Sequence, residues 1–423
     1  MKRYLSCFLL LLLLFCTACS SQHANAGEDT AEDSTPASGF VENTPENPDI
    51  SRETEKTHPP AEEILPPPDP KTVEIEDILS RMTLAEKVGQ MFFVRCPGAN
   101  QTELVAQYHL GGYLLFGRDF KDSEDNWLTR QQFTDNVESY QSASQIPLLI
   151  GVDEEGGTVA RATRNPNLFS EKRPSPQKVF AAGGMDGIRQ DAYEVSGELL
   201  TLGINVNFAP VADVSTDPHD FIYDRAFGQD AETTAIYITY ALMGANSSQV
   251  HVTDEARPRQ MGSVLKHFPG YGSNVDTHTG IALDDRPYEQ FLAEDFLPFR
   301  AGIENGAGSV LVSHNIVSCM DADLPASLSP AVHTVLREEL GFEGVILTDD
   351  LAMDAVEAYA EDGSVAVLAV QAGNDMIVTT DFETQIPQVI AAVEDGTISE
   401  DTINAAVTRI LSWKYDLGII VNK

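Results

Sequence analysis

The chain has 423 residues, and its 65 acidic and 27 basic side chains give it a formal net charge of −38. This excess of negative charge argues against nucleic-acid binding, which needs a basic surface to neutralise phosphates, and against charge-driven docking on anionic lipid. Because 42% of the residues are hydrophobic, the composition still allows a large folded core. The length is compatible with one large barrel or with two to three ordinary domains.

The first residues have the layout of an export signal. Lys2 and Arg3 precede an apolar run over 8–15, which is too short to span a bilayer and has the length of a secretory core segment. We therefore expect an exported protein. Ordinary signal cleavage near Ala24 or Ala26 is one way in which the signal could end.

We favour the alternative interpretation that the signal peptide ends at a lipid-modified cysteine. Residues 17–20 read Thr-Ala-Cys-Ser and resemble a bacterial lipobox, in which the cysteine carries a lipid and becomes the mature N-terminus. Cys16 stands where the lipobox usually has Leu. We predict a signal peptide over 1–19 and a lipid on Cys19 that anchors the protein to the outer side of the cytoplasmic membrane.

Residues 20–70 are predicted to be a disordered, acidic, Pro-rich tether. They contain nine of the 23 Pro residues and carry a net charge of −10. Such a segment buries too little apolar surface to offset the entropy of ordering it. The tether would hold the remaining residues, 71–423, away from the membrane, and these carry a net charge of −30.

Of the five cysteines, only Cys96 and Cys319 lie in the predicted domain. This number excludes a disulfide framework, and no Cys-x-x-Cys metal pattern is present. One Cys96–Cys319 bridge is conceivable, but we expect two separate buried thiols.

Residues 71–423 alternate between short apolar runs and helical patterns. Continuous apolar runs of this length are typical of buried parallel strands. Eight of them in about 350 residues predict an α/β fold with a single (β/α)8 TIM-type barrel. A doubly wound open sheet is the alternative, although no Gly-x-Gly-x-x-Gly motif follows any run. The predicted strands are Met91–Arg95, Tyr113–Phe116, Leu148–Val152, Val206–Ala209, Val264–His267, Val310–Ser313, Val345–Thr348 and Met376–Val378. Helices are expected, for example, over Asp191–Leu202, Gln290–Glu304 and Pro330–Leu340.

Polar residues concentrate where these strands end, which is where barrel enzymes place their active sites. Lys266, at the end of an apolar strand, would be costly to bury without a partner, so we expect it to grip a ligand. Of the pair Asp349-Asp350, the second is expected to cap the following helix or to pack, and the first to face the site. The other strand-end groups are Asp153-Glu154-Glu155, Asp213, Arg225, His267 and Ser313-His314-Asn315.

Asp276 and His278 lie in a Gly-rich loop over 268–287. Their spacing lets the carboxylate orient an imidazole for proton transfer. A solvated turn is the plainer interpretation of the same pair. A zinc site made by His267, Asp276 and His278 is a third reading, which we disfavour because no recognised ligand motif accompanies it.

Five segments together resemble glycoside hydrolase family 3, and within it the bacterial β-N-acetylhexosaminidase branch. They occur in the family's order over residues 71–423 and read GVDEEGGTVAR (151–161), YDRAFG (223–228), KHFPG (266–270), DTH (276–278) and TDDLAM (348–353). Two positions depart from the pattern. Tyr271 stands where the family often has His, and Thr158 stands where it often has Arg.

The resemblance implies a role for each matched residue. Asp349 would be the catalytic nucleophile, and His278 would be the acid/base, oriented by Asp276. The terminal sugar would be bound by Asp153, Arg161, Arg225, Lys266 and His267. No metal or organic cofactor is implied.

The predicted activity is that of a retaining exo-β-N-acetylglucosaminidase. It would release terminal non-reducing N-acetylglucosamine from carbohydrate substrates such as peptidoglycan fragments, and we expect a monomer that does not bind nucleic acid. Two alternatives remain open. A His acid/base does not repel anions, so phosphate could replace water and make the enzyme a phosphorylase; or the chain could be a sugar-binding lipoprotein.

Overall fold

The computed structural model describes residues 69–252, 257–274, 282–353, 356, 359 and 364–420. The predicted signal peptide, Cys19 and all of the predicted tether up to residue 68 lie outside the described residues, as do Asp276 and His278. None of the helices described is long and apolar enough to cross a membrane.

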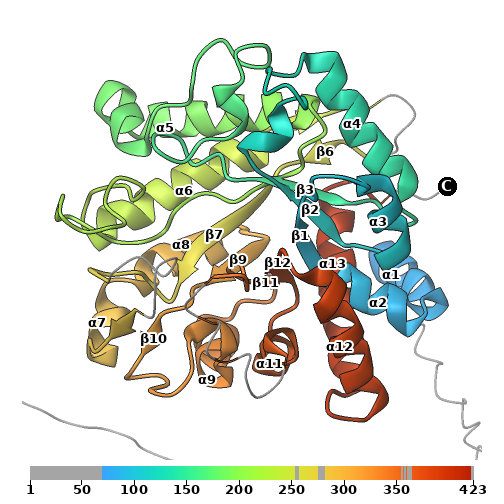
Figure 1. Ribbon diagram of the computed structural model, residues 1–423. Helices are drawn as coiled ribbons and strands as arrows, with labels where there is room; N and C mark the ends of the chain where they lie inside the picture. The colour runs from blue at the N-terminus through green and yellow to red at the C-terminus, as the bar shows by residue number, and fades with distance from the viewer. Residues whose placement is uncertain are drawn as a thin grey trace, which may run out of the picture. The chain divides into compact units, whose positions relative to one another are not determined.

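Eight parallel strands form the centre of the described domain (Figure 1). Each strand pairs with the next one along the chain, and the last returns to pair with the first. The remaining seam is joined by a parallel bridge between Leu347 and Met376, so the barrel is nearly closed. The predicted eight strands are therefore confirmed, and the open-sheet alternative is wrong. The strands are β1 (Phe92–Arg95), β2 (Gly112–Leu115), β3 (Leu149–Val152), β4 (Val206–Asn207), β7 (Gly262–Phe268), β9 (Ser309–Val312), β11 (Val345–Thr348) and β12 (Ile377–Thr379).

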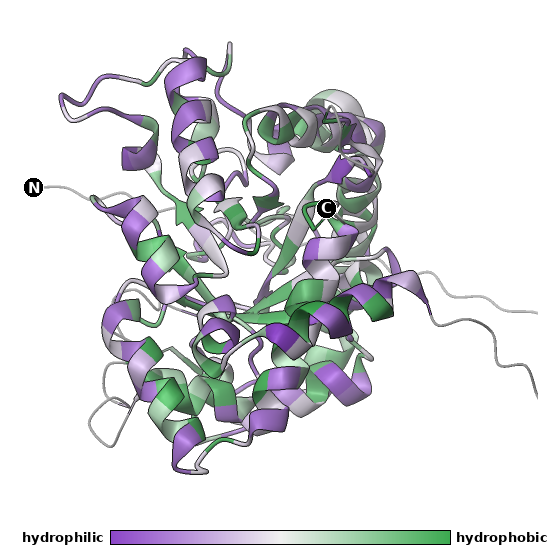
Figure 2. Cartoon of the chain, turned by 90° about the vertical axis from the view of Figure 1, so that its right-hand side faces the viewer, coloured by the Kyte–Doolittle hydropathy of each residue, from purple (hydrophilic) through white to green (hydrophobic). Residues whose placement is uncertain are grey.

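Helices surround the strands in Figure 1, and Figure 2 shows hydrophobic residues along the strands and on the helix sides that pack against them. Side chains of the helices thus cover the outside of the barrel, as parallel sheets require. The α-helices are α1 (Pro70–Arg81), α2 (Leu84–Gln90), α3 (Gln101–Tyr108), α4 (Arg130–Ala143), α5 (Pro176–Thr201), α6 (Ala231–Ser247), α7 (Tyr288–Ala293), α8 (Phe296–Glu304), α9 (Pro330–Thr334), α11 (Val365–Ala372), α12 (Phe382–Glu394) and α13 (Glu400–Asp416). Short strand pairs are formed by β5 (Gln249–Val250) with β6 (Arg259–Gln260) and by β8 (Leu283–Asp284) with β10 (Ile316–Val317).

The helices differ from the predicted ones mainly at their boundaries. The helix expected from Asp191 is the second half of α5, which begins at Pro176 and is kinked at Gly184, where φ is 62°. The single helix expected over Gln290–Glu304 is two helices, because the chain leaves helical geometry at Glu294. The helix expected over Pro330–Leu340 is α9 followed by a π-helical turn.

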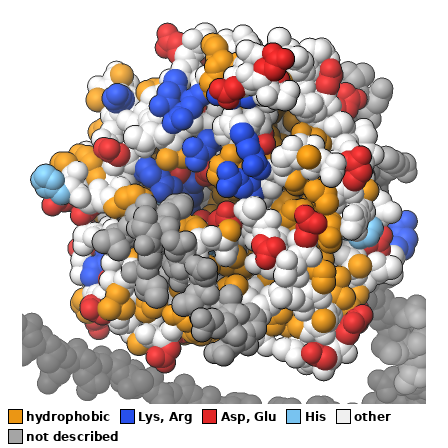
Figure 3. All heavy atoms as spheres, in the orientation of Figure 1, with side chains coloured by type: hydrophobic (Ala, Val, Ile, Leu, Met, Phe, Trp, Pro, Cys, Tyr) orange, Lys and Arg blue, Asp and Glu red, His pale blue; other side chains and the backbone are white. Residues whose placement is uncertain are grey.

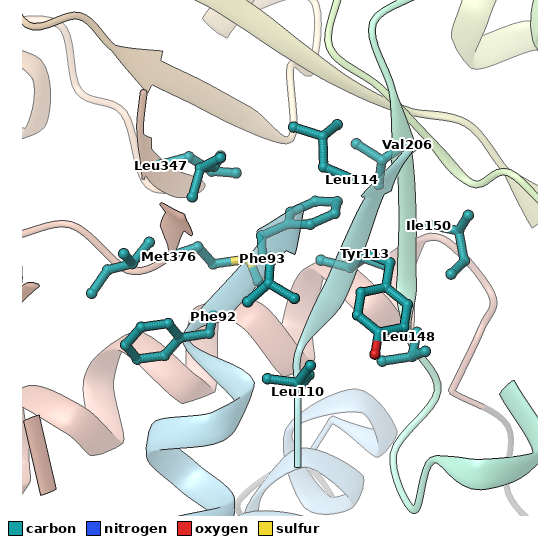
Figure 4. Close-up of a cluster of buried hydrophobic side chains, with 14 of the residues drawn as sticks. Phe92, Phe93, Leu110, Tyr113, Leu114, Leu148, Ile150, Val206, Leu347 and Met376 are labelled. Carbon is teal, nitrogen blue, oxygen red and sulfur yellow. The ribbon is translucent and has the colours of Figure 1, made fainter. Parts of the chain in front are cut away.

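Large aromatic residues fill the inside of the barrel. The rings of Phe93 and Phe208 meet edge to face with their centroids 5.2 Å apart. A Cβ atom at Gly151 would lie 2.7 Å from the Phe93 ring and 2.8 Å from the Phe208 ring, so this packing requires glycine there. Figure 4 shows Phe93 among aliphatic side chains from neighbouring strands. Because the interior is filled, a ligand can bind only at the end of the barrel.

The two cysteines of the domain are separate free thiols, so the Cys96–Cys319 bridge is not formed. Cys96 is buried, as expected, and burial raises the pKa of its thiol far above the usual range. The expectation that both thiols are buried is wrong for Cys319, which is exposed in the turn after β10.

Candidate active site

A cavity of about 250 Å³ opens at the carboxyl ends of the barrel strands. Six residues predicted for substrate binding or catalysis line it: Asp153, Arg161, Arg225, Lys266, His267 and Asp349. Asp276 and His278 are outside the described residues, so their place relative to the cavity stays a prediction. The rest of the lining is Arg95, Leu114, Phe116, Val159, Phe208, Tyr271, Leu311, Asp350, Met353 and Val378.

Lys266 and Arg225 are held by two carboxylates. The Lys266 Nζ lies 2.7 Å from an oxygen of Asp153 and 2.7 Å from Oε1 of Glu155. Arg225 donates two hydrogen bonds to Glu155, from Nε to Oε2 at 3.0 Å and from Nη2 to Oε1 at 2.8 Å. Such paired, bidentate contacts fix the direction of both cations. The sequence-based argument that Lys266 needs a partner is thus satisfied within the protein, before any ligand binds.

Buried charge in this network is stabilised by opposite charge. Burial by itself raises the pKa of Glu155, but the positive charges of Arg225 and Lys266 outweigh burial and leave the pKa lowered overall. Burial likewise lowers the pKa of Lys266, but the charges of Asp153 and Glu155 outweigh it, so that pKa is raised. Both groups therefore stay ionised at neutral pH, and the cations keep their full hydrogen-bonding capacity.

His267 is fixed in one tautomer by its neighbours. Its Nδ1 lies 2.7 Å from Oδ2 of Asp213, and its Nε2 lies 3.1 Å from Nη2 of Arg225. Because a guanidinium can only donate, Nε2 must accept, and the ring proton resides on Nδ1 and is donated to Asp213. Both ring nitrogens are thus engaged, which argues against the zinc reading in which His267 is a ligand. Among the residues that the structure describes, no three His, Cys, Asp or Glu side chains are grouped to hold a metal.

An irregularity in β7 brings two consecutive side chains into the same cavity. The pairing of β7 with β9 shifts register between Leu265 and Phe268. In a regular strand, neighbouring side chains point to opposite faces, whereas a bulge can re-aim one of them. At this irregularity the peptide bond between Lys266 and His267 is cis, and both side chains line the cavity.

The loop after β3 is organised around Glu154, which is fully buried. Its carboxylate accepts hydrogen bonds from the backbone N–H groups of Arg161, Ala162 and Thr163 at 2.9, 2.8 and 3.2 Å. These contacts hold the backbone at Arg161 in place. The Arg161 Nη2 lies 3.9 Å from Oδ2 of Asp153.

Asp349 and Asp350 play different structural parts. The Asp349 backbone N–H continues the sheet by donating to Val312 at 3.0 Å, and its carboxylate oxygen Oδ1 accepts from the Asp350 N–H at 2.9 Å. The Asp350 carboxylate accepts from the Ala352 N–H at 3.0 Å, a contact two residues along the chain that stabilises a turn. Asp349 lines the cavity at the end of β11.

The sequence reasoning named Glu155 and Asp213 as strand-end residues but gave them no role. Glu155 follows Asp153 by two positions, which in extended backbone places both on the same side. That spacing was a usable signal for Glu155. No comparable signal exists for Asp213, because its partner His267 is 54 residues away.

The two residues that depart from the family pattern, Tyr271 and Thr158, have different surroundings in the structure. Tyr271 is buried, its ring lies edge-on to His267 with centroids 5.5 Å apart, and its N–H donates to Asp213 at 2.8 Å. Thr158 is exposed, and its carbonyl accepts from Arg164. Tyr271 therefore supports the His267–Asp213 pair, whereas Thr158 lies on the surface.

Comparison with known proteins agrees with this architecture. The profile of the glycosyl hydrolase family 3 N-terminal domain matches residues 83–413. A beta-hexosaminidase of Nitrosomonas eutropha is 32% identical over 289 residues, which cover 66% of this chain and 76% of that protein. A beta-hexosaminidase of Stenotrophomonas maltophilia (strain R551-3) is 30% identical over 336 residues, covering 75% and 92%.

A solved structure of a glycoside hydrolase is also similar to this chain. The glycoside hydrolase family 3 beta-N-acetylglucosaminidase from Paenibacillus sp. FPU-7 has 30% sequence identity and a TM-score of 0.70. The match covers 81% of this chain but only 64% of that one, so this chain corresponds to part of the longer protein. The profile match, the relatives and the eight-stranded parallel barrel together show that this chain belongs to glycosyl hydrolase family 3 and is a glycoside hydrolase.

Proposed function

We propose that this protein is a retaining exo-β-N-acetylglucosaminidase that removes terminal, non-reducing N-acetylglucosamine from glycosides such as peptidoglycan fragments. The observation that carries the proposal is one cavity in which Asp349 lies with Lys266, Arg225, Asp153 and His267. This set combines a carboxylate with fixed donors and acceptors for sugar hydroxyls. The names of the related beta-hexosaminidases support an N-acetylhexosaminide as substrate.

The first chemical step forms a glycosyl-enzyme. An oxygen of Asp349 attacks the anomeric carbon, the bond from that carbon to the leaving oxygen breaks, and His278 gives its proton to the leaving oxygen. Asp276 orients the imidazole of His278. In the second step, His278 takes a proton from water, whose oxygen then displaces Asp349 from the anomeric carbon.

The cations of the cavity position the sugar. Lys266 and Arg225 are already fixed by Glu155 and Asp153, so they need little rearrangement when hydroxyl groups bind. Preorganised contacts of this kind hold the anomeric carbon in line with the nucleophile, where small displacements cost rate.

The nucleophile is tested by replacing Asp349. The variant Asp349→Ala should lose release of p-nitrophenol from its N-acetyl-β-glucosaminide by a factor on the order of 10⁴ or more, since the covalent route is gone. The matched control is Asp350→Asn, which keeps an oxygen able to cap Ala352 and should retain most activity. Wild-type turnover in Asp349→Ala would disprove the assignment.

The acid role of His278 is tested by changing the leaving group. A p-nitrophenolate leaves with little protonation, whereas a sugar alkoxide needs a proton. His278→Ala should therefore lose much more activity on a chitobioside than on the p-nitrophenyl glycoside. An equal loss on both substrates would contradict the role.

The two alternative functions are tested with the wild-type protein. Running both assays with and without phosphate, with analysis of the products, separates hydrolysis from phosphorolysis. Turnover by the wild type separates an enzyme from a sugar-binding lipoprotein.

The location of the enzyme is part of the same proposal. A lipid on Cys19 and the tether over 20–70 would hold the barrel outside the cytoplasmic membrane, where peptidoglycan fragments occur. The support is the lipobox-like sequence at residues 17–20 and the Pro-rich, acidic composition that follows it.

A further inference from the structure

The two central cations of the cavity depend on carboxylates that come from one short loop. Figure 3 shows Lys and Arg side chains near the middle of the face that it draws. Lys266 and Arg225 line the cavity and are held by Asp153 and Glu155. Both carboxylates belong to the loop after β3, one on each side of Glu154. A contact that fixes the backbone at Glu154 therefore also fixes the two carboxylates and the cations that they hold.

Arg173 makes such a contact. Its Nη1 donates to the carbonyl oxygen of Glu154, which also accepts from Nδ2 of Asn207 at 3.2 Å. The peptide group between Glu154 and Glu155 is thus held from two sides, by Arg173 and by the end of β4. Hydrogen bonds from a charged donor are stronger than those between neutral groups, so the contact from Arg173 is expected to be the stronger of the two.

The main chain of Arg173 contacts the same loop at two further points. Its N–H donates to Oγ1 of Thr163 at 3.0 Å, and its carbonyl accepts from the N–H of Gly157 at 3.1 Å. The two backbone segments also approach closely, because a Cβ atom at Gly156 would lie 2.2 Å from the carbonyl oxygen of Pro174. The chain at Arg173 therefore lies directly against the loop after β3.

The guanidinium of Arg173 is itself fixed by α5. Its Nε and Nη2 both donate to Oδ2 of Asp191, at 2.9 and 2.7 Å, and only 12% of the Arg173 side chain is exposed. The planar group can serve Asp191 and the Glu154 carbonyl at the same time because its donors point in several fixed directions. Arg173 thus joins a long helix of the barrel to the backbone of the loop.

Close packing does not fix Glu155 on this side. A cavity of about 30 Å³ is lined by Glu155 and Arg173 together with residues of α5 and α6, among them Asp191 and Tyr237. In a close-packed interior, the neighbours leave a side chain little room to shift. Beside this cavity the position of the loop depends more on its hydrogen bonds, so loss of the Arg173 contact would let the loop move.

We propose that Arg173 is a positioning residue of the active site: through the backbone of the loop after β3, it holds Asp153 and Glu155 where they fix the two cations. The inference rests on the proposed function and adds to it a residue that touches no substrate. It assigns Arg173 to binding of the terminal sugar and not to proton transfer, because the side chains that depend on it are those proposed to bind that sugar.

The test measures the affinity for N-acetylglucosamine by calorimetry, which needs no turnover. Arg173→Met keeps an apolar side chain but removes every donor, and it should raise the dissociation constant about tenfold, the loss typical of one hydrogen bond with a charged group. Arg173→Lys keeps the charge but lacks the planar fork, so it should recover part of the affinity. An unchanged dissociation constant in Arg173→Met would overturn the proposal.

Kinetics separate a role in sugar binding from a role in proton transfer. Arg173→Met should lower kcat/KM by the same factor on the p-nitrophenyl N-acetyl-β-glucosaminide and on a chitobioside, since both substrates carry the same terminal sugar. A loss confined to the chitobioside would place the effect at the acid/base step and would also overturn the proposal.

Two other variants distinguish positioning from a general loss of stability. Arg130 also pairs with a carboxylate of α5, that of Glu198 at 2.9 Å, but it lies in α4 and not against the loop. Arg130→Met should therefore leave the affinity unchanged. Asp191→Asn weakens the ion pair but leaves the contact with the Glu154 carbonyl, so it should lower the Tm and keep most of the affinity. Equal losses of affinity in Asp191→Asn and Arg173→Met would contradict an effect exerted through the loop.

The outcomes also separate this inference from the proposed function. If the wild type does not bind N-acetylglucosamine, the proposed substrate and the role of Arg173 are both wrong. If the wild type and Arg173→Met bind it equally well, the proposed function stands and the positioning role alone is wrong. Circular dichroism at the temperature of the assay checks that each variant is folded, and Arg173→Lys provides the comparison if Arg173→Met does not fold.

Discussion

Glu155 is the residue on which the two central cations of the cavity depend. It is buried, contacts both Lys266 and Arg225, and supplies no group to the cavity lining itself. Its role is to position the residues that would touch the sugar. Removing one member of a buried, hydrogen-bonded charge network leaves the others uncompensated, which costs more than the contact itself contributes.

We predict that Glu155→Gln lowers the free energy of unfolding by about 3 kcal/mol at pH 7 and abolishes most glycosidase activity. Since the pKa of Glu155 is lowered in the folded state, its contribution is fully present above its ordinary value of 4.5 and is lost as the pH falls below it. The stability gap between wild type and variant should therefore shrink below about pH 4.5, which urea unfolding at a series of pH values measures. Glu171→Gln, at an exposed position of the same loop, is the control and should change little; a gap that does not depend on pH would contradict the assigned charge state.

At the level of single residues, the sequence indicated which side chains lie at the strand ends, but it did not indicate their ion-pair partners. Lys266 could be singled out because a lysine ending an apolar strand is costly to bury alone. Its partners could not be identified, since Asp153 is 113 positions away and ion pairing over such a separation leaves no local pattern. The surroundings of Arg95 could not be predicted for the same reason: only the structure shows that no carboxylate of the described residues pairs with it.

Among the elements, α13 contains a buried lysine without an acidic partner in the described residues. The Lys414 side chain is fully buried and donates to Oε1 of Gln90 at 2.6 Å, with no acidic partner in the described residues. Burial lowers the pKa of this amine to about 7. Near pH 7, about half of the Lys414 side chains are therefore uncharged, and burying the charged form destabilises the fold.

We predict that Lys414→Met stabilises the protein by about 2 kcal/mol at pH 7, after the loss of the Gln90 hydrogen bond is subtracted. The folded-state pKa lies below the ordinary value of 10.5, so the unfolded chain binds more protons between these two values and wild-type stability rises with pH there. The advantage of Lys414→Met should accordingly be largest at and below pH 7 and disappear as the pH approaches 10.5. Thermal unfolding across this range tests it. Lys87→Met removes a lysine that is paired with Glu400 at 3.0 Å and should show no such gain; equal behaviour of both variants would argue against an unpaired amine.

Strands were easier to predict than helices for a physical reason. A buried parallel strand is apolar on both faces, so each of the eight appears as a continuous run that any reader of the sequence can find. Helix limits depend on tertiary contacts. The break between α7 and α8 illustrates this, because Asp295 at the break is buried against Arg286, with 2.8 Å between their charged atoms.

At the scale of the whole molecule, the proposed lipid anchor on Cys19 is joined to the barrel by the predicted acidic tether. We predict that bacteria expressing the wild type incorporate labelled palmitate into the protein and retain it in the membrane fraction. Cys19→Ala should incorporate no label and appear in the soluble exported fraction, with unchanged activity because the residue lies far in sequence from the barrel. Cys16→Ala is the control and should still be labelled; label retained in Cys19→Ala would show that the lipid is elsewhere.

The sequence by itself determined the eight strands, their order and the chemical groups at their ends, because hydrophobic periodicity and strand-end position are local properties. The tertiary structure decided which groups compensate one another: Glu155 with Lys266 and Arg225, and Asp213 with His267. Pairing of charges depends on distances across the barrel between residues far apart in the chain, and barrel closure alone sets those distances. The acidity of the chain argued against whole classes of partner, but only the folded arrangement showed that Arg95, Arg161, Arg225 and Lys266 line one cavity within it.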